Sequence, residues 1–143
     1  MVIVAAVDRS DRASVAIEEA EALAKAFDDK VHVVHALTRS EFLDLGITSA
    51  QAEEPLDMEQ VRDAAAEMAG EAASELSVPY ETVGLVGKPS DEVVRYAREQ
   101  DARYVTVSPR KRSRTGKVLF GSVAQSILLN ASCPVVTNTI HEA

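Results

Sequence analysis

The stretch Val2-Ile3-Val4-Ala5-Ala6-Val7-Asp8-Arg9-Ser10 decides the fold. Its apolar run is short, continuous and ended by an acid, which is the pattern of a parallel strand buried on both faces. Ser10 or Asp11 then offers an N-cap for a helix whose apolar stripe recurs at three- and four-residue steps as far as Phe27. A buried strand followed by an amphipathic helix predicts the start of a βαβ unit.

Strand patterns and helix patterns continue to alternate along the rest of the sequence. Further strands are predicted at residues 31–36, 80–86, 104–107 and 134–137, and further helices at 58–76, from 89 onward, and at 121–131. Only the connector of residues 37–56 has weak periodicity. The pattern predicts an α/β fold: a doubly wound, five-stranded parallel sheet of order 3-2-1-4-5 with helices on both faces.

Composition indicates one ordinary domain. The chain has 143 residues, 46% hydrophobic and 27% charged, which suits a single domain over residues 1–143 with its own core. It contains no apolar run of about eighteen residues, so we expect no membrane span. The apolar start has no basic residues before it, unlike a secretion signal, and Cys133 is the lone cysteine. Both features favour the cytoplasm.

Charge is unevenly distributed along the chain. Its 15 basic and 23 acidic residues give a net charge of −8, a halophile-like acidic balance that argues against binding nucleic acid through overall charge. One segment, residues 103–117, has no acid and contains Arg103, Arg110, Lys111, Arg112, Arg114 and Lys117. Such a segment predicts either an anion site or a solvated basic loop.

The predicted topology brings this basic segment to a ligand-binding position. In the order 3-2-1-4-5 the winding reverses between the first and fourth strands, and ligands of open α/β sheets bind at the carboxyl ends of the strands beside that point. The loops that meet there are Asp8-Arg9-Ser10 and the segment from Ser108 onward. Topology and charge therefore predict the same crevice.

The predicted crevice has the polarity of a nucleotide. Free N–H groups at the start of a helix bind anions, and cationic side chains strengthen such a site. The residues with these groups are Gly121, Ser122, Val123, Arg110, Lys111 and Arg112. Asp8, on the opposite side, can accept hydrogen bonds from a ribose or an adenine amine. An ordinary N-cap serine is the simpler interpretation of Ser122 alone.

Several segments together resemble the universal stress protein family. They are Val4-Ala5-Ala6-Val7-Asp8-Arg9-Ser10 before a helix, Val33-Val34-His35-Ala36, Gly87-Lys88-Pro89, and Leu119-Phe120-Gly121-Ser122-Val123-Ala124 followed by Ala131-Ser132-Cys133-Pro134-Val135-Val136. They cover essentially the whole chain in the family's order. The resemblance implies a Rossmann-like fold of the adenine nucleotide alpha hydrolase type and a stress-response regulator.

The resemblance also implies a ligand and its contacts. Asp8 would contact the adenosine, the backbone of Ala36 would meet the adenine, and Gly121-Ser122 would hold phosphate. The ligand would be ATP or AMP, with magnesium accompanying ATP, or another phosphorylated molecule.

The chain departs from the family's phosphate motif in its first half. ATP-binding members have Gly, two residues, Gly, nine residues, then Gly-Ser or Gly-Thr, and the first two glycine positions here are Ser108 and Lys111. Neither takes positive φ freely, and Pro109 lacks an N–H, so backbone donors are lost. The cationic side chains that follow can offset this loss.

Two other functions remain open from the residues. A nucleotide-free interaction module would use the basic loop to dock an acidic protein partner, and the incomplete motif favours it. An enzyme of the adenylating or hydrolase type is the weaker alternative, since no nucleophile signature occurs and we expect at most slow ATP hydrolysis. A P-loop at Thr115-Gly116-Lys117 is excluded because Val118 replaces the required Ser or Thr.

The remaining polar signals have structural explanations. His32 and His35 lie three apart on a strand and so face opposite sides, which argues against a shared metal. Cys133 before a buried strand is most simply a small core residue. The last strand, if it lies at the sheet edge, leaves backbone groups unpaired. We therefore expect a homodimer through Val135 and Val136, which the family resemblance also implies.

Overall fold

A computed structural model describes residues 1–9, 12–45, 57–112 and 118–138. Its main sheet has the strand order β3-β2-β1-β4-β7, and all neighbouring strands run parallel. The strands are β1 (Val2–Ala6), β2 (Lys30–Leu37), β3 (Tyr80–Val86), β4 (Tyr104–Thr106) and β7 (Val135–Val136). The predicted five-stranded parallel sheet of order 3-2-1-4-5 is confirmed.

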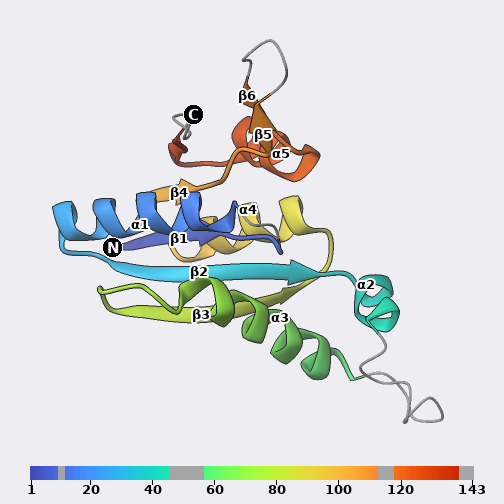
Figure 1. Ribbon diagram of the computed structural model, residues 1–143. Helices are drawn as coiled ribbons and strands as arrows, with labels where there is room; N and C mark the ends of the chain where they lie inside the picture. Colours follow the sequence, from blue (N-terminus) through green and yellow to red (C-terminus); the bar gives the residue numbers. More distant parts are fainter. Residues whose placement is uncertain (10–11, 46–56, 113–117, 139–143) are drawn as a thin grey trace.

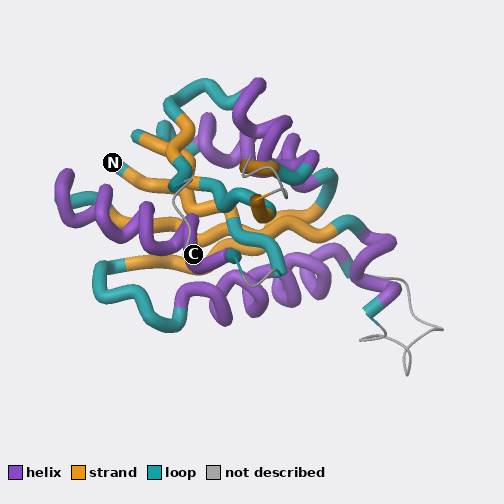
Figure 2. Tube along the Cα trace, turned by 45° about the horizontal axis from the view of Figure 1, so that its top comes forward, coloured by secondary structure: helices purple, strands orange, loops and turns teal. Residues whose placement is uncertain are grey.

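Helices cover both faces of the sheet (Figure 2). On one face α1 (Ala13–Phe27) and α3 (Met58–Ala73) pack on apolar side chains of β1 and β2. On the other, α4 (Pro89–Glu99) and α5 (Ser122–Asn130) pack on β1, β2 and β4. Every residue of β2 after Lys30 is buried, as expected of a strand covered on both faces.

The residues at the starts of α3 and α4 are ones that favour the first turn of a helix. Pro89 occupies the first turn of α4, where its missing N–H costs no hydrogen bond. Asp57 caps α3 by accepting a bond of 2.9 Å from the Glu59 N–H. The first helix differs from the prediction: α1 has Arg12 at its N-cap with no side-chain capping bond. The predicted caps Ser10 and Asp11 lie outside the described residues.

Two elements were not expected from the sequence. A short helix, α2 (Arg39–Asp44), follows β2 in the connector, and Thr38 and Glu41 form a capping box at its start. The basic segment is not a simple loop, because β5 (Lys111–Arg112) pairs antiparallel with β6 (Val118–Leu119). Figure 1 shows this hairpin beside α5. The remaining basic residues Arg114 and Lys117 lie outside the described part of the chain.

No helix in the described part of the chain combines the length and the apolar character that a membrane span requires.

Candidate functional site

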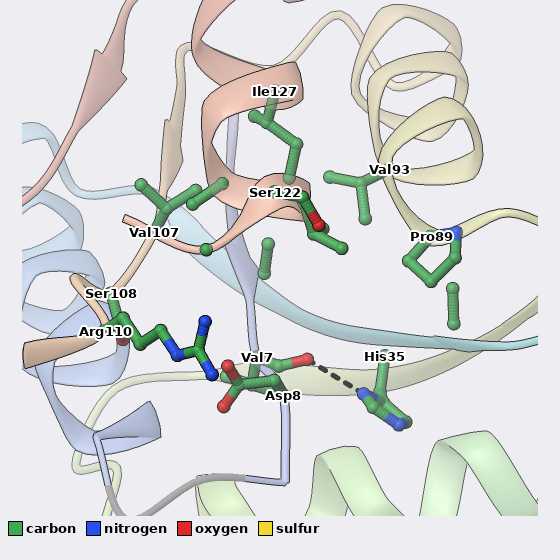
Figure 3. Close-up of a pocket in the computed structure, with 15 residues that line it drawn as sticks. Val7, Asp8, His35, Pro89, Val93, Val107, Ser108, Arg110, Ser122 and Ile127 are labelled. Atoms are coloured by element: carbon green, nitrogen blue, oxygen red, sulfur yellow. Dashed lines mark hydrogen bonds between the residues drawn. The ribbon is translucent and has the colours of Figure 1, made fainter. Parts of the chain in front are cut away.

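A pocket of about 330 Å³ lies at the carboxyl ends of the central strands (Figure 3). It is built from β1 and the turn after it, β2, the start of α4, the segment after β4, and the first turns of α5. Its lining residues are Ala6, Val7, Asp8, His35, Ala36, Pro89, Val93, Val107, Ser108, Arg110, Gly121, Ser122, Val123, Ala124 and Ile127. The two segments that the sequence predicts to converge therefore form one crevice.

Seven predicted site residues line this pocket: Asp8, Ala36, Ser108, Arg110, Gly121, Ser122 and Val123. The backbone of Lys111 lies in β5, and its side chain is outside the described part of the structure. Sequence reasoning missed the apolar wall of Pro89, Val93, Val107 and Ile127. The periodicity of α4 predicts that Val93 faces inward, which the structure confirms, but it does not show that Val93 lines a pocket.

The start of α5 lies in the pocket wall. Gly121 is the N-cap residue, in an extended conformation with φ −70°, and no side chain caps the helix. A Cβ placed on Gly121 would meet no atom of the described residues within 4 Å, so they leave the space beside this backbone open. The first N–H groups of α5 have no partner within the helix and carry partial positive charge, which favours an anion.

Opposite charges face each other across the mouth of the pocket. Asp8 follows β1, and Arg110 follows β4. Figure 3 shows the Arg110 side chain extended toward the Asp8 carboxylate. The Arg110 backbone is held by its N–H, which donates to the Leu119 carbonyl oxygen at 2.6 Å. This bond fixes the backbone from which the Arg110 side chain extends.

Ser108 has a structural role in addition to lining the pocket. Its Oγ accepts a hydrogen bond of 3.0 Å from the Ala16 N–H of α1. The Thr106 hydroxyl donates to the Ala16 carbonyl oxygen at 2.8 Å. Together these bonds fasten α1 to the end of β4. The Ser108 Oγ accepts the bond from α1, and its hydroxyl proton can still be donated to a ligand.

The floor of the pocket contains an unpaired backbone edge. The β1–β2 ladder ends at Ala6 and Val34, so Ala36 lies beyond its last rung. Toward β3, the Val31 N–H donates to Pro79 and the Leu37 carbonyl accepts from Gly87. Strand residues alternate in direction, so the N–H and C=O of Ala36 face the β1 side. No hydrogen bond from the described residues reaches them there.

The two strand histidines face opposite sides of the sheet, as predicted. On one face His32 Nδ1 lies 2.7 Å from the Tyr96 hydroxyl of α4, and burial lowers the pKa of His32 although Glu81 opposes the shift. On the other face His35 is buried, with Nδ1 2.8 Å from the Val7 carbonyl oxygen. The described residues contain no cluster of ligating side chains that could hold a metal ion.

Cys133 is half-buried beside the core of β4 and α5. Burial raises the pKa of its thiol, which disfavours the reactive thiolate form. This agrees with the sequence interpretation.

Comparison with known proteins identifies the family and the fold of this chain. The model of the universal stress protein family matches residues 1–137. The chain belongs to the universal stress protein family. A curated universal stress protein from Methanocaldococcus jannaschii is 29% identical over 94% of this chain and 79% of its own length.

Solved structures agree with this assignment. A universal stress protein from Archaeoglobus fulgidus has a TM-score of 0.67 and 32% identity, covering 94% of this chain and 95% of its own. A second structure, of the Archaeoglobus fulgidus protein in complex with dAMP, has a TM-score of 0.63 and 27% identity, covering 94% of both chains. The Rossmann-like α/β fold of this universal stress protein is therefore shared with solved relatives.

Proposed function

We propose that this universal stress protein is a stress-response regulator that binds an adenine nucleotide, AMP or ATP, in the crevice between β1 and β4. The observation that carries the proposal is the backbone edge of Ala36, which pairs with none of the described residues and lies in the same pocket as the start of α5. Buried backbone groups without partners are rare in folded proteins. A ligand that pairs with this edge explains why the fold leaves it open.

Adenine complements the Ala36 edge. Its Watson–Crick edge presents an amine donor next to a ring-nitrogen acceptor, and such an edge pairs with a carbonyl and an N–H. The apolar walls of Val93, Val107 and Ile127 suit a flat base. Asp8 beside them can accept from a ribose hydroxyl or a base amine. The relative solved in complex with dAMP, 27% identical, supports this class of ligand.

Under this proposal the phosphate lies at the start of α5. The amides of Ser122 and Val123 donate to it, Gly121 lets it approach the backbone, and Arg110 provides the cation. Lys111 on the hairpin is the second cationic candidate. Since the described residues hold no cluster of metal ligands, magnesium would arrive with the phosphates of ATP.

The proposal is tested by thermal unfolding of the purified chain with AMP and with ATP, each with and without magnesium. A ligand at 100 times its dissociation constant adds about 2.7 kcal/mol to the free energy of unfolding. We expect a clear rise in Tm with at least one nucleotide. No shift with either nucleotide under either condition would refute nucleotide binding.

Gly121→Asp tests where the phosphate lies. The substitution puts a carboxylate at the anion position, and the open space beside Gly121 means that the fold accommodates the new side chain. Gly121→Ala adds a Cβ in the same space without an acceptor that could bind the N–H groups of α5, and is the matched control. We expect Asp to abolish the Tm shift and Ala to retain most of it. Normal binding by the Asp variant would show that the phosphate lies elsewhere.

The same experiments decide between nucleotide binding and the interaction-module alternative. If nucleotides do not bind, a salt-sensitive complex between the basic hairpin and an acidic protein becomes the better proposal. Turnover of ATP that is lost in Asp8→Ala or Ser122→Ala would instead support an enzyme. We expect at most slow hydrolysis.

A further inference from the structure

One histidine side chain holds the end of β1 at the floor of the pocket. His35 Nδ1 lies 2.8 Å from the Val7 carbonyl oxygen. A carbonyl oxygen only accepts hydrogen bonds, so Nδ1 carries a proton and donates it. The residue is 8% exposed, and its Nε2 has no hydrogen-bond partner in the described structure that would favour the other tautomer.

This side-chain bond takes the place of a backbone rung. The Val7 N–H donates to the Val34 carbonyl oxygen at 3.0 Å. In a continuing parallel ladder, the next rung would run from the Ala36 N–H to the Val7 carbonyl. The register between β1 and β2 stops at Ala6 and Val34, so this rung is not formed. The donor to Val7 is His35 instead.

We propose that His35 is a positioning residue for the nucleotide site, an inference that rests on the proposed function. Its imidazole satisfies the Val7 carbonyl and so ends the β1–β2 ladder one rung early. The backbone edge of Ala36 then stays open toward the pocket, where it meets the adenine. Without this donor, the Val7 carbonyl would be buried and unpaired. The alternative donor to the Val7 carbonyl in a continuing ladder is the Ala36 N–H. That hydrogen bond would pair the Ala36 edge with β1 and leave it unavailable to the adenine.

Two variants of His35 distinguish the effect of its N–H donor from the effect of its side-chain volume. His35→Asn keeps an N–H donor near the position of Nδ1, whereas His35→Leu keeps the bulk and removes the donor. AMP is the ligand, and its affinity is measured by titration calorimetry. We expect the Leu variant to bind about tenfold more weakly, and the Asn variant to stay within about threefold of the wild type. His32→Asn, on the opposite face of β2, is the control and should bind as the wild type does.

A measurement on the ligand-free protein tests the same inference directly. Scalar coupling in NMR spectra detects a hydrogen bond between the Ala36 amide nitrogen and the Val7 carbonyl carbon. We expect no coupling in the wild type or in His35→Asn, and a coupling in His35→Leu. A coupling in the wild type would overturn the inference, as would a Leu variant that binds AMP normally.

The two readouts also separate this inference from the proposed function. A wild type that binds neither AMP nor ATP refutes nucleotide binding, and the ligand-free spectra still decide whether His35 keeps the Ala36 edge open. If His35→Leu does not fold, the wild-type spectrum and the affinity of His35→Asn decide the question. A loss of affinity in His35→Asn comparable to that expected of the Leu variant would contradict the donor role.

Discussion

Asp29 is a buried carboxylate at the amino-terminal end of the sheet, far along the strands from the pocket. The Arg103 Nε donates to its Oδ2 at 2.6 Å, and the Arg103 guanidinium lies 4.3 Å from the centre of the Phe27 ring. The hydrogen bond from Arg103 lowers the pKa of Asp29, although burial opposes the shift. The pair therefore fastens β4 to the turn before β2.

Asp29→Asn should lower Tm at neutral pH, by about 3 °C if the loss is that of one ordinary interaction. Because the pKa of Asp29 is lower in the folded state, its stabilising contribution is complete above its ordinary value of about 4. That contribution is lost as the pH falls below 4. The difference in Tm between wild type and variant should accordingly shrink in acid.

The neighbouring Asp28→Asn is a matched control for this prediction. Asp28 has φ 55°, a left-handed conformation that asparagine adopts readily. It should leave Tm almost unchanged across the pH range. Thermal unfolding followed by circular dichroism measures both variants. A constant difference between Asp29→Asn and wild type down to pH 2 would contradict the role of the carboxylate charge.

Arg103 and Arg110 belong to one basic segment of the sequence, but they lie at opposite ends of the sheet. In the sequence Arg103 belongs to the same acid-free segment as Arg110. In the fold, β4 lies between them, so Arg103 reaches Asp29 at one end of the sheet while Arg110 lines the pocket at the other. Because a strand is extended, residues at its two ends are far apart in space. Counting charges along the sequence does not show this separation.

At the scale of elements, one glycine sets the distance between α3 and the sheet. A Cβ on Gly84 of β3 would lie 1.8 Å from the Arg62 carbonyl oxygen and 2.6 Å from the Ala66 nitrogen, both backbone atoms of α3. Backbone cannot yield as a flexible side chain does. The helix therefore packs directly on the strand only because position 84 has no side chain.

Gly84→Ala should reduce the free energy of unfolding by about 3 kcal/mol, because the new methyl group forces α3 away from the sheet. Gly70→Ala is the control within α3. Its Cβ would meet only the Thr82 side chain at 3.8 Å, and alanine favours the helix by about 0.5–1 kcal/mol. Urea denaturation of the two variants should show opposite signs. A Gly84→Ala protein as stable as the wild type would show that α3 is not fixed at this distance.

Elements with a strong internal pattern could be predicted, and elements without one could not. The buried strands and the amphipathic helices are periodic, and the structure contains them close to the expected bounds. The short helix α2 has only a local signal, the capping box of Thr38 and Glu41, in a connector without apolar periodicity. The hairpin of Lys111–Arg112 and Val118–Leu119 has no such signal, because basic residues in strands follow no apolar alternation.

At the scale of the whole molecule, topology predicts where the pocket lies but not which backbone groups and side-chain hydrogen bonds shape it. Asp8 and Gly121 could be placed because they follow strand ends or open a helix beside the switch point. The unpaired edge of Ala36 depends on where a ladder stops, and the roles of His35 and Ser108 depend on single side-chain bonds to Val7 and Ala16. Such bonds join residues distant in sequence, so no local pattern predicts them.

The edge of the sheet supports the proposal of a homodimer. In the described sheet β7 pairs only with β4, through the Pro134 and Val136 carbonyl oxygens, which accept from Val105 and Val107 at 3.1 and 3.0 Å. By alternation, the N–H and C=O of Val135 face away from β4. A second copy that pairs with β7 across a two-fold axis would satisfy them.

Val135→Pro tests this dimer with little effect on the monomer. Proline removes one outward N–H and leaves the bonds to β4 in place, which is the situation in which edge strands tolerate it. Val135→Thr keeps the N–H and the side-chain shape and is the control. By sedimentation equilibrium we expect dimers for the wild type and the Thr variant, and at least a tenfold weaker association, on the order of one lost hydrogen bond, for the Pro variant. A monomeric wild type, or a Pro variant that associates as tightly, would show that β7 is not the interface.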